Sequence, residues 1–130
     1  MEIKEYLKKY KVLCDGAFGT YFAMLCGDNL IPEKANIDNP EIVKMIHKNY
    51  IASGANLIRT NTFSSNIAML ECSKKELIEN IKNGYKLAKE AVYESNKDVF
   101  IAADIGSINI SEVCDCDITA QYKLICDTFI

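Results

Sequence analysis

The sequence lacks the features that mark membrane, secreted and nucleic-acid-binding proteins. No apolar run approaches the ~20 residues of a transmembrane helix, and the charged N-terminal segment has no apolar core of the kind found in secretory signals. Basic residues are interspersed with acids at a net charge of −3, whereas a nucleic-acid surface needs clustered Lys and Arg. We therefore expect a cytoplasmic protein that binds neither a membrane nor nucleic acid.

The cysteines do not indicate a disulfide framework or a metal site. Six cysteines without a secretory signal are expected to remain reduced. The only close pair is Cys114 and Cys116, and zinc ligands usually have at least two intervening residues. The sequence also lacks the glycine-rich fingerprints of dinucleotide and nucleoside triphosphate sites. We expect no metal ligand among these residues.

What the chain does contain is an alternation of short apolar runs and helical patterns. With 49% hydrophobic and 25% charged residues, it has the composition of an ordinary globular domain or of a piece of one. The apolar runs predict three buried strands, at 11–14, 55–58 and 99–103. Apolar residues at steps of three and four predict helices over 2–10, 40–53, 73–96 and 120–130.

Two of these helices have clear end signals. Asp38 or Asn39 can cap the helix that begins at Pro40, and Gly54 ends it. The next helix opens on the capping-box sequence S-x-x-E that begins at Ser73. These signals place a helix after each of the first two strands.

A polar residue follows each predicted strand. Asp15, Thr60 and Asp104 stand at these three ends, roughly 45 residues apart, a spacing typical of repeated strand–helix units with a parallel sheet. Strands that are apolar throughout fit such a sheet, because it is covered on both faces. Ligands of parallel α/β proteins bind at the carboxyl ends of the strands. We therefore expect a ligand site where these three residues meet.

Three strands are too few to close a (β/α)8 barrel, which takes about 250 residues. The chain is therefore expected to be a small open α/β domain or a part of a barrel. The last helical pattern reaches Ile130 without a stop signal. That favours the second interpretation, in which residues 1–130 form the N-terminal part of one barrel domain.

Several motifs, in the expected order over nearly the whole chain, resemble the homocysteine S-methyltransferase family. The stretch D-G-A-F-G-T at 15–20 resembles the opening motif of that family, and T-N-T-F at 60–63 resembles a second motif. Further similar stretches are N-I-D-N-P at 36–40, S-G-A-N-L-I at 53–58 and D-I-G-S at 104–107. The family includes the homocysteine-binding module of methionine synthase and betaine-homocysteine methyltransferase.

The resemblance implies a fold and a reaction. The fold is a (β/α)8 barrel, of which this chain would supply about the first three strand–helix units. The reaction is methyl transfer to the thiol of homocysteine, giving methionine. The resemblance also implies a zinc ion that activates the thiol, held by cysteines that are not in this chain. The methyl donor would be methyltetrahydrofolate by way of cobalamin bound to other domains, betaine or S-methylmethionine.

The resemblance further implies that this segment binds the amino-acid end of homocysteine. Asp15 would receive the substrate ammonium, and we count it as the one catalytic candidate. The backbone N–H groups of Gly16, Ala17 and Phe18 would receive the substrate carboxylate. The other expected binding residues lie at the second and third strand ends: Thr60, Asn61, Thr62, Phe63, Asp104 and Gly106.

Two other functions stay open at this point. The chain can be a non-catalytic α/β fragment that binds an amino acid or a partner chain. It can also belong to an unrelated barrel enzyme whose strand-end acids act on another substrate. If the chain is part of a homocysteine S-methyltransferase, the isolated chain is expected to be inactive, because it lacks the metal site and leaves barrel strand edges unpaired.

Overall fold

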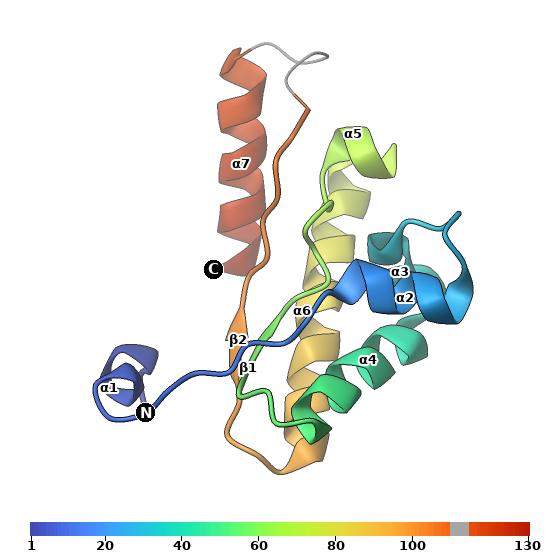
Figure 1. The fold of residues 1–130 in the computed structure, drawn as a ribbon. Helices are drawn as coiled ribbons and strands as arrows, with labels where there is room; N and C mark the ends of the chain where they lie inside the picture. The colour runs from blue at the N-terminus through green and yellow to red at the C-terminus, as the bar shows by residue number, and fades with distance from the viewer. Residues whose placement is uncertain (110–114) are drawn as a thin grey trace.

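A computed structural model describes residues 1–109 and 115–130 (Figure 1). Two short strands lie at its centre, and helices surround them on one side and at one end. No helix among the described residues is long and apolar enough to span a membrane. The elements, in chain order, are α1 (Ile3–Leu7), α2 (Phe18–Cys26), the 3-10 helix η1 (Pro32–Lys34), α3 (Ala35–Asp38), α4 (Pro40–Ala52), β1 (Leu57–Arg59), α5 (Ile67–Leu70), α6 (Lys74–Ser95), β2 (Phe100–Ala102) and α7 (Asp115–Phe129).

The parallel sheet predicted from the sequence is present in shortened form. Strands β1 and β2 pair in parallel, with Ile58 opposite Ile101. The first predicted strand, 11–14, lies beside β1 but forms only one bridge, between Cys14 and Leu57. All three segments therefore run in the same direction, and their carboxyl ends meet at one edge, as expected.

In the first segment, the Asn56 side chain takes over part of the backbone hydrogen bonding, and other backbone groups of the segment still pair with residues 56 and 57. The Leu13 N–H donates to Asn56 Oδ1 at 2.6 Å, and Asn56 Nδ2 donates to the Lys11 carbonyl at 3.4 Å. Backbone N–H and C=O groups that form a hydrogen bond with a side-chain amide no longer need one from a neighbouring strand. The exposed Leu13 side chain also shows that this segment is not buried as the apolar run predicted.

One face of the sheet packs against α4 and α6 (Figure 1). Ile58 of β1 is fully buried there against Ile51 of α4 and against Ala88 and Ala91 of α6. The small alanines let α6 approach the strands closely, and the buried isoleucines supply most of the apolar area. This packing fixes the position at which each strand ends.

The structure confirms the two helices with clear end signals. Helix α4 begins at Pro40 and is followed by Gly54 at φ +111°, a conformation that favours glycine. Helix α6 has the full capping box, in which the Ser73 hydroxyl accepts from the Glu76 N–H and the Glu76 carboxylate accepts from the Ser73 N–H. Both helices therefore start and stop where their terminal residues predicted.

Three helical segments differ from the prediction. Helix α1 covers only Ile3–Leu7, and none of its residues is buried. The Tyr6 ring of this helix packs edge-on against Phe100. Helix α7 begins at Asp115, five residues before the apolar pattern. Helix α2 was not predicted, since D-G-A-F-G-T was interpreted as a loop. Its aromatic and apolar residues pack against α4.

A close approach at Gly84 joins α6 to the loop after β1. A Cβ atom at this position would lie 2.9 Å from Asn36 Nδ2 and 2.9 Å from Thr62 Cγ2. Both neighbours are buried and hydrogen-bonded, so neither can easily move away. Glycine at position 84 therefore sets the distance between α6 and the strand-end loop.

Substituting Gly84→Ala should lower the free energy of unfolding by about 1–3 kcal/mol, because it forces two held side chains apart. Denaturant unfolding followed by circular dichroism measures the change. The matched control is Gly19→Ala in α2, whose Cβ would meet only Pro32 Cγ at 3.9 Å. That change should be neutral or stabilising by less than about 1 kcal/mol. Equal effects at the two positions would contradict the close-approach explanation.

Candidate functional site

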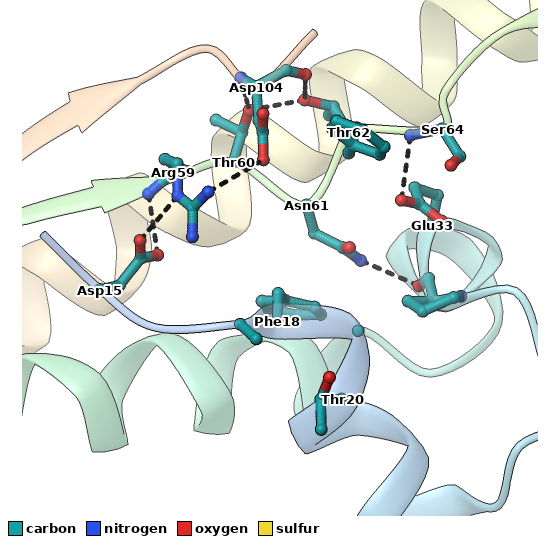
Figure 2. A pocket seen from close by; sticks show the side chains of 14 residues that line it. Asp15, Phe18, Thr20, Glu33, Arg59, Thr60, Asn61, Thr62, Ser64 and Asp104 are labelled. Carbon is teal, nitrogen blue, oxygen red and sulfur yellow. Dashed lines mark hydrogen bonds and ion pairs between the residues drawn. The ribbon is translucent and has the colours of Figure 1, made fainter. Parts of the chain in front are cut away.

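A pocket lies at the carboxyl ends of the three parallel segments (Figure 2). Its volume is about 390 Å³, enough for an amino acid. The lining residues come from the end of the first segment, the start of α2, η1, the last residue of β1 and the loop after it, and the loop after β2. They are Asp15, Ala17, Phe18, Gly19, Thr20, Pro32, Glu33, Arg59, Thr60, Asn61, Thr62, Phe63, Ser64 and Asp104.

Eight of the ten predicted site residues line this pocket. The two others, Gly16 and Gly106, lie beside its walls. A Cβ atom at Gly16 would come within 2.9 Å of the Tyr50 ring, and one at Gly106 would lie 2.5 Å from the Phe63 carbonyl. The Gly106 N–H also donates to that carbonyl at 3.0 Å. Both glycines allow close packing behind the pocket.

The central interaction of the pocket is an ion pair between Asp15 and Arg59. Arg59 Nε donates to Asp15 Oδ1 at 2.9 Å, and the Arg59 backbone N–H donates to Asp15 Oδ2 at 3.0 Å. The Asp15 side chain is only 1% exposed. Both carboxylate oxygens are therefore occupied by one residue of the neighbouring strand, and the pairing raises the pKa of Arg59 above its ordinary value.

Arg59 also reaches the other two strand ends. Its Nη2 donates to the Gly16 carbonyl at 3.0 Å, and its Nη1 lies 4.0 Å from Asp104 Oδ2 (Figure 2). Burial raises the pKa of Asp104, the nearby Arg59 lowers it, and Asp15 raises it. Arg59 is thus the one cation among three strand-end segments, and sequence reasoning did not select it. The signal was present, since Arg59 is the only arginine of the sequence and stands at a strand end.

Thr60 and Thr62 connect the second strand end to the third. The Asp104 N–H donates to Thr60 Oγ1 at 3.1 Å, and Thr62 Oγ1 donates to the Asp104 carbonyl at 2.8 Å. The two hydroxyl oxygens are 2.6 Å apart, so Thr60 donates to Thr62 and the set forms a closed ring. The single protons of both hydroxyls are therefore used within the protein. The ring fixes the backbone of Asp104.

Asn61 belongs to a buried amide network. Its Nδ2 donates to the Pro32 carbonyl at 2.9 Å and to Asn36 Oδ1 at 3.0 Å, which uses both of its N–H groups. Asn36 Nδ2 in turn donates to the Asn61 carbonyl and to Asn80 Oδ1. The network holds the loop after β1 against η1 and α6, so it shapes one wall of the pocket.

Glu33 is a second lining residue that sequence reasoning missed. It is buried, and its Oε1 accepts the Ser64 N–H at 3.0 Å. It stands directly after Pro32, where an acid suits the first turn of η1, and nothing in that local pattern indicates a pocket. Its carboxylate adds negative charge to the wall opposite Arg59 (Figure 2).

Two phenylalanines provide the apolar part of the pocket. Phe63 is 55% exposed and lies over Gly106. Phe18 opens helix α2 and packs on His47 of α4, with 5.2 Å between the ring centroids. No side chain caps the N-terminus of α2, whose first residues line the pocket. The uncapped N–H groups and the positive end of the helix dipole therefore face the cavity beside Phe18.

His47 is fully buried beneath this wall, and neither ring nitrogen has a hydrogen-bond partner. Burial lowers the pKa of His47 from 6.5 to about 4, and the Asp15 charge opposes that shift only weakly. The imidazole is thus neutral near pH 7, and it serves to pack α2 on α4.

The described residues contain no group of three or more His, Cys, Asp or Glu side chains that could hold a metal ion. The described residues therefore do not supply a site for the zinc that the resemblance implies, and no step through zinc is derived from them. Cys114 lies outside the described residues.

The sequence profile of the homocysteine S-methyltransferase family matches residues 12–123. The chain belongs to this family. The match covers every residue of the pocket, including Arg59 and Glu33.

Solved structures of the homocysteine methyltransferase MmuM from Escherichia coli share the fold of this chain. The metallated form aligns with a TM-score of 0.73 at 19% identity, over 97% of this chain and 54% of MmuM. The oxidized form gives 0.70 at 19% identity, over 97% and 53%. The chain thus spans about half the length of MmuM, and at such identity the likeness concerns the fold alone.

Because the pKa of His47 is about 4 in the folded chain and about 6.5 when unfolded, the unfolded state binds more protons between these values. Neutral His47 makes its full contribution to the free energy of unfolding above about pH 6.5. This free energy should fall by about 3 kcal/mol as the pH approaches 4. Urea unfolding of wild type and His47→Leu over this range isolates the contribution. The variant should show a flatter profile and higher stability at low pH. Parallel profiles would show that His47 does not titrate this way.

Proposed function

We propose that this chain is the amino-acid-binding part of a homocysteine S-methyltransferase and forms the first strand–helix units of a (β/α)8 barrel. The observation that carries the proposal is the pocket in which Arg59 joins Asp15 and Asp104 at three parallel strand ends. Active sites of such barrels lie at this edge. Membership of the family supplies the substrate class, a thiol that carries an amino-acid group.

The pocket offers complementary surfaces to each part of homocysteine. The uncapped N-terminus of α2 and the Arg59 guanidinium favour an anion, so the substrate carboxylate is placed between them. The acids at the strand ends favour the ammonium. Phe18 and Phe63 cover the two methylenes of the substrate. The thiol then points away from the amino-acid end, toward the metal that the rest of the enzyme would hold outside the described residues.

Under this proposal the described residues bind and orient the substrate. Thr60, Thr62 and Asn61 hold the pocket walls in place. Their hydroxyl and amide protons all donate to groups of the protein, so none is left for the substrate. Fixing the amino-acid end limits the motion of the reacting sulfur, and such positioning contributes several kcal/mol to catalysis in enzymes generally.

A non-catalytic protein that binds an amino acid would use the same pocket. The two functions differ in product formation, because only the methyltransferase consumes a methyl donor. Binding of homocysteine separates both from an unrelated barrel enzyme, which would bind neither homocysteine nor methionine at this site.

The complete protein should convert L-homocysteine to methionine with zinc and one of three donors: methyltetrahydrofolate by way of cobalamin, betaine, or S-methylmethionine. Ala17→Phe places a ring in the pocket and should lower kcat/KM for homocysteine about tenfold or more. Lys48→Gln, on the far side of α4, should leave it unchanged. Methionine formation, measured by mass spectrometry, distinguishes the methyltransferase from a non-catalytic binding protein. Homocysteine binding without methionine from any donor would favour the non-catalytic function.

A further inference from the structure

We propose that Tyr122, on helix α7, is a positioning residue that holds the Phe63 ring over the pocket through the loop after β2. The inference rests on the proposed function, in which this ring covers the apolar part of the acceptor. Tyr122 itself lies outside the lining of the pocket. Any effect that it has on the acceptor therefore passes through the residues between them.

The Tyr122 hydroxyl bridges two backbone groups of the loop after β2. It donates to the Gly106 carbonyl at 3.2 Å and accepts the Ile108 N–H at 3.0 Å. A phenol has a single proton to donate, and here that proton is used on Gly106. Helix α7 lies beside the chain that leaves β2 (Figure 1), and this side chain joins the two segments by hydrogen bonds.

Both ends of this bridge are anchored in the core. The Tyr122 ring packs against the cluster that contains Leu77 and Ile81 of α6. Ile108 belongs to the same cluster and is 3% exposed, so its N–H has little access to water that could replace the hydroxyl. A buried donor that loses its acceptor costs free energy. The packing of α6 and α7 thus fixes where the loop lies.

Gly106 passes this constraint to Phe63. The Gly106 N–H donates to the Phe63 carbonyl at 3.0 Å. A Cβ atom at position 106 would lie 2.9 Å from Phe63 Cδ2 and 2.9 Å from Cε2, so the ring rests directly on the glycine backbone. Phe63 is 55% exposed and lines the pocket. Because the ring has solvent on its other side, a shift of Gly106 changes the position of the ring.

The backbone on either side of Phe63 is held without Tyr122. The Thr62 hydroxyl donates to the Asp104 carbonyl, and the Ser64 N–H donates to Glu33. Loss of the Tyr122 hydroxyl should therefore free the Phe63 ring from its support without unfolding the loop after β1. The expected effect is confined to the apolar wall of the pocket.

The test is a double-mutant cycle on the complete enzyme, with kcat/KM for L-homocysteine as the measured quantity. Tyr122→Phe keeps the ring in its cluster, removes the hydroxyl and should lower kcat/KM about 3- to 10-fold. Phe63→Leu removes the aromatic ring and should lower it about tenfold. If Tyr122 acts through Phe63, the double variant stays within about twofold of Phe63→Leu alone. A loss equal to the product of the two single losses would overturn the inference, because it is the result of independent structural roles.

Tyr93→Phe is the matched control, since Tyr93 is 85% exposed on α6, and it should leave kcat/KM unchanged. Circular dichroism confirms that each variant is folded at the assay temperature. A Tyr122→Phe enzyme with the wild-type kcat/KM would also overturn the inference.

Amide hydrogen exchange of the full-length protein tests the same bridge without catalysis. Tyr122→Phe should speed exchange of the Gly106 N–H about tenfold and leave that of Ile58 in β1 unchanged. Wild-type exchange at Gly106 in this variant would overturn the inference whatever the activity. A wild-type enzyme that makes no methionine, with faster exchange at Gly106 in the variant, would refute the proposed function and support the link from Tyr122 to the Phe63 wall.

Discussion

The ion pair between Asp15 and Arg59 is the constraint on which the pocket depends. A carboxylate with a side chain that is 1% exposed is costly to bury unless it is paired and hydrogen-bonded, and the only arginine of the sequence provides both kinds of contact. The same guanidinium reaches the Gly16 carbonyl and approaches Asp104. One residue of β1 therefore joins the ends of all three parallel segments, where the sheet itself contributes only three residues in each strand.

A second layer of contacts keeps this edge in place. The ring of Thr60, Thr62 and Asp104 ties the loop after β1 to the residue after β2, and the Asn61 amide ties the same loop to η1. These buried polar groups are well satisfied, so they specify one arrangement of the loop. Because position 84 is glycine, α6 can pack directly against Asn36 and Thr62. The shape of the pocket is thus linked to helix packing outside it.

The sequence predicted the features that depend on local chemistry. The capping box at Ser73 and the start of α4 at Pro40 follow from residues close together in the chain, and the parallel direction of the strands follows from the repeated strand–helix order. It did not predict features that depend on distant partners. In the first segment, Asn56 takes over part of the backbone hydrogen bonding, and α2 was missed because Gly19 interrupts the helical signal. Arg59 and Glu33 were overlooked for the same reason, since their importance comes from neighbours at least 30 residues away.

The charges of the pocket also limit what this part of the protein contributes to a reaction. Under the proposed function, Asp15, Glu33, Asp104 and Arg59 would recognise the zwitterionic end of the acceptor, because they bring acidic and basic groups together around one pocket. Under the proposed function, binding energy from the amino-acid end is used to hold the sulfur at the reacting centre. Such energy raises the rate only when the distance between the two ends is fixed. Under the proposed function, the contacts at the strand ends would therefore contribute to the rate by holding the amino-acid end of the acceptor in place.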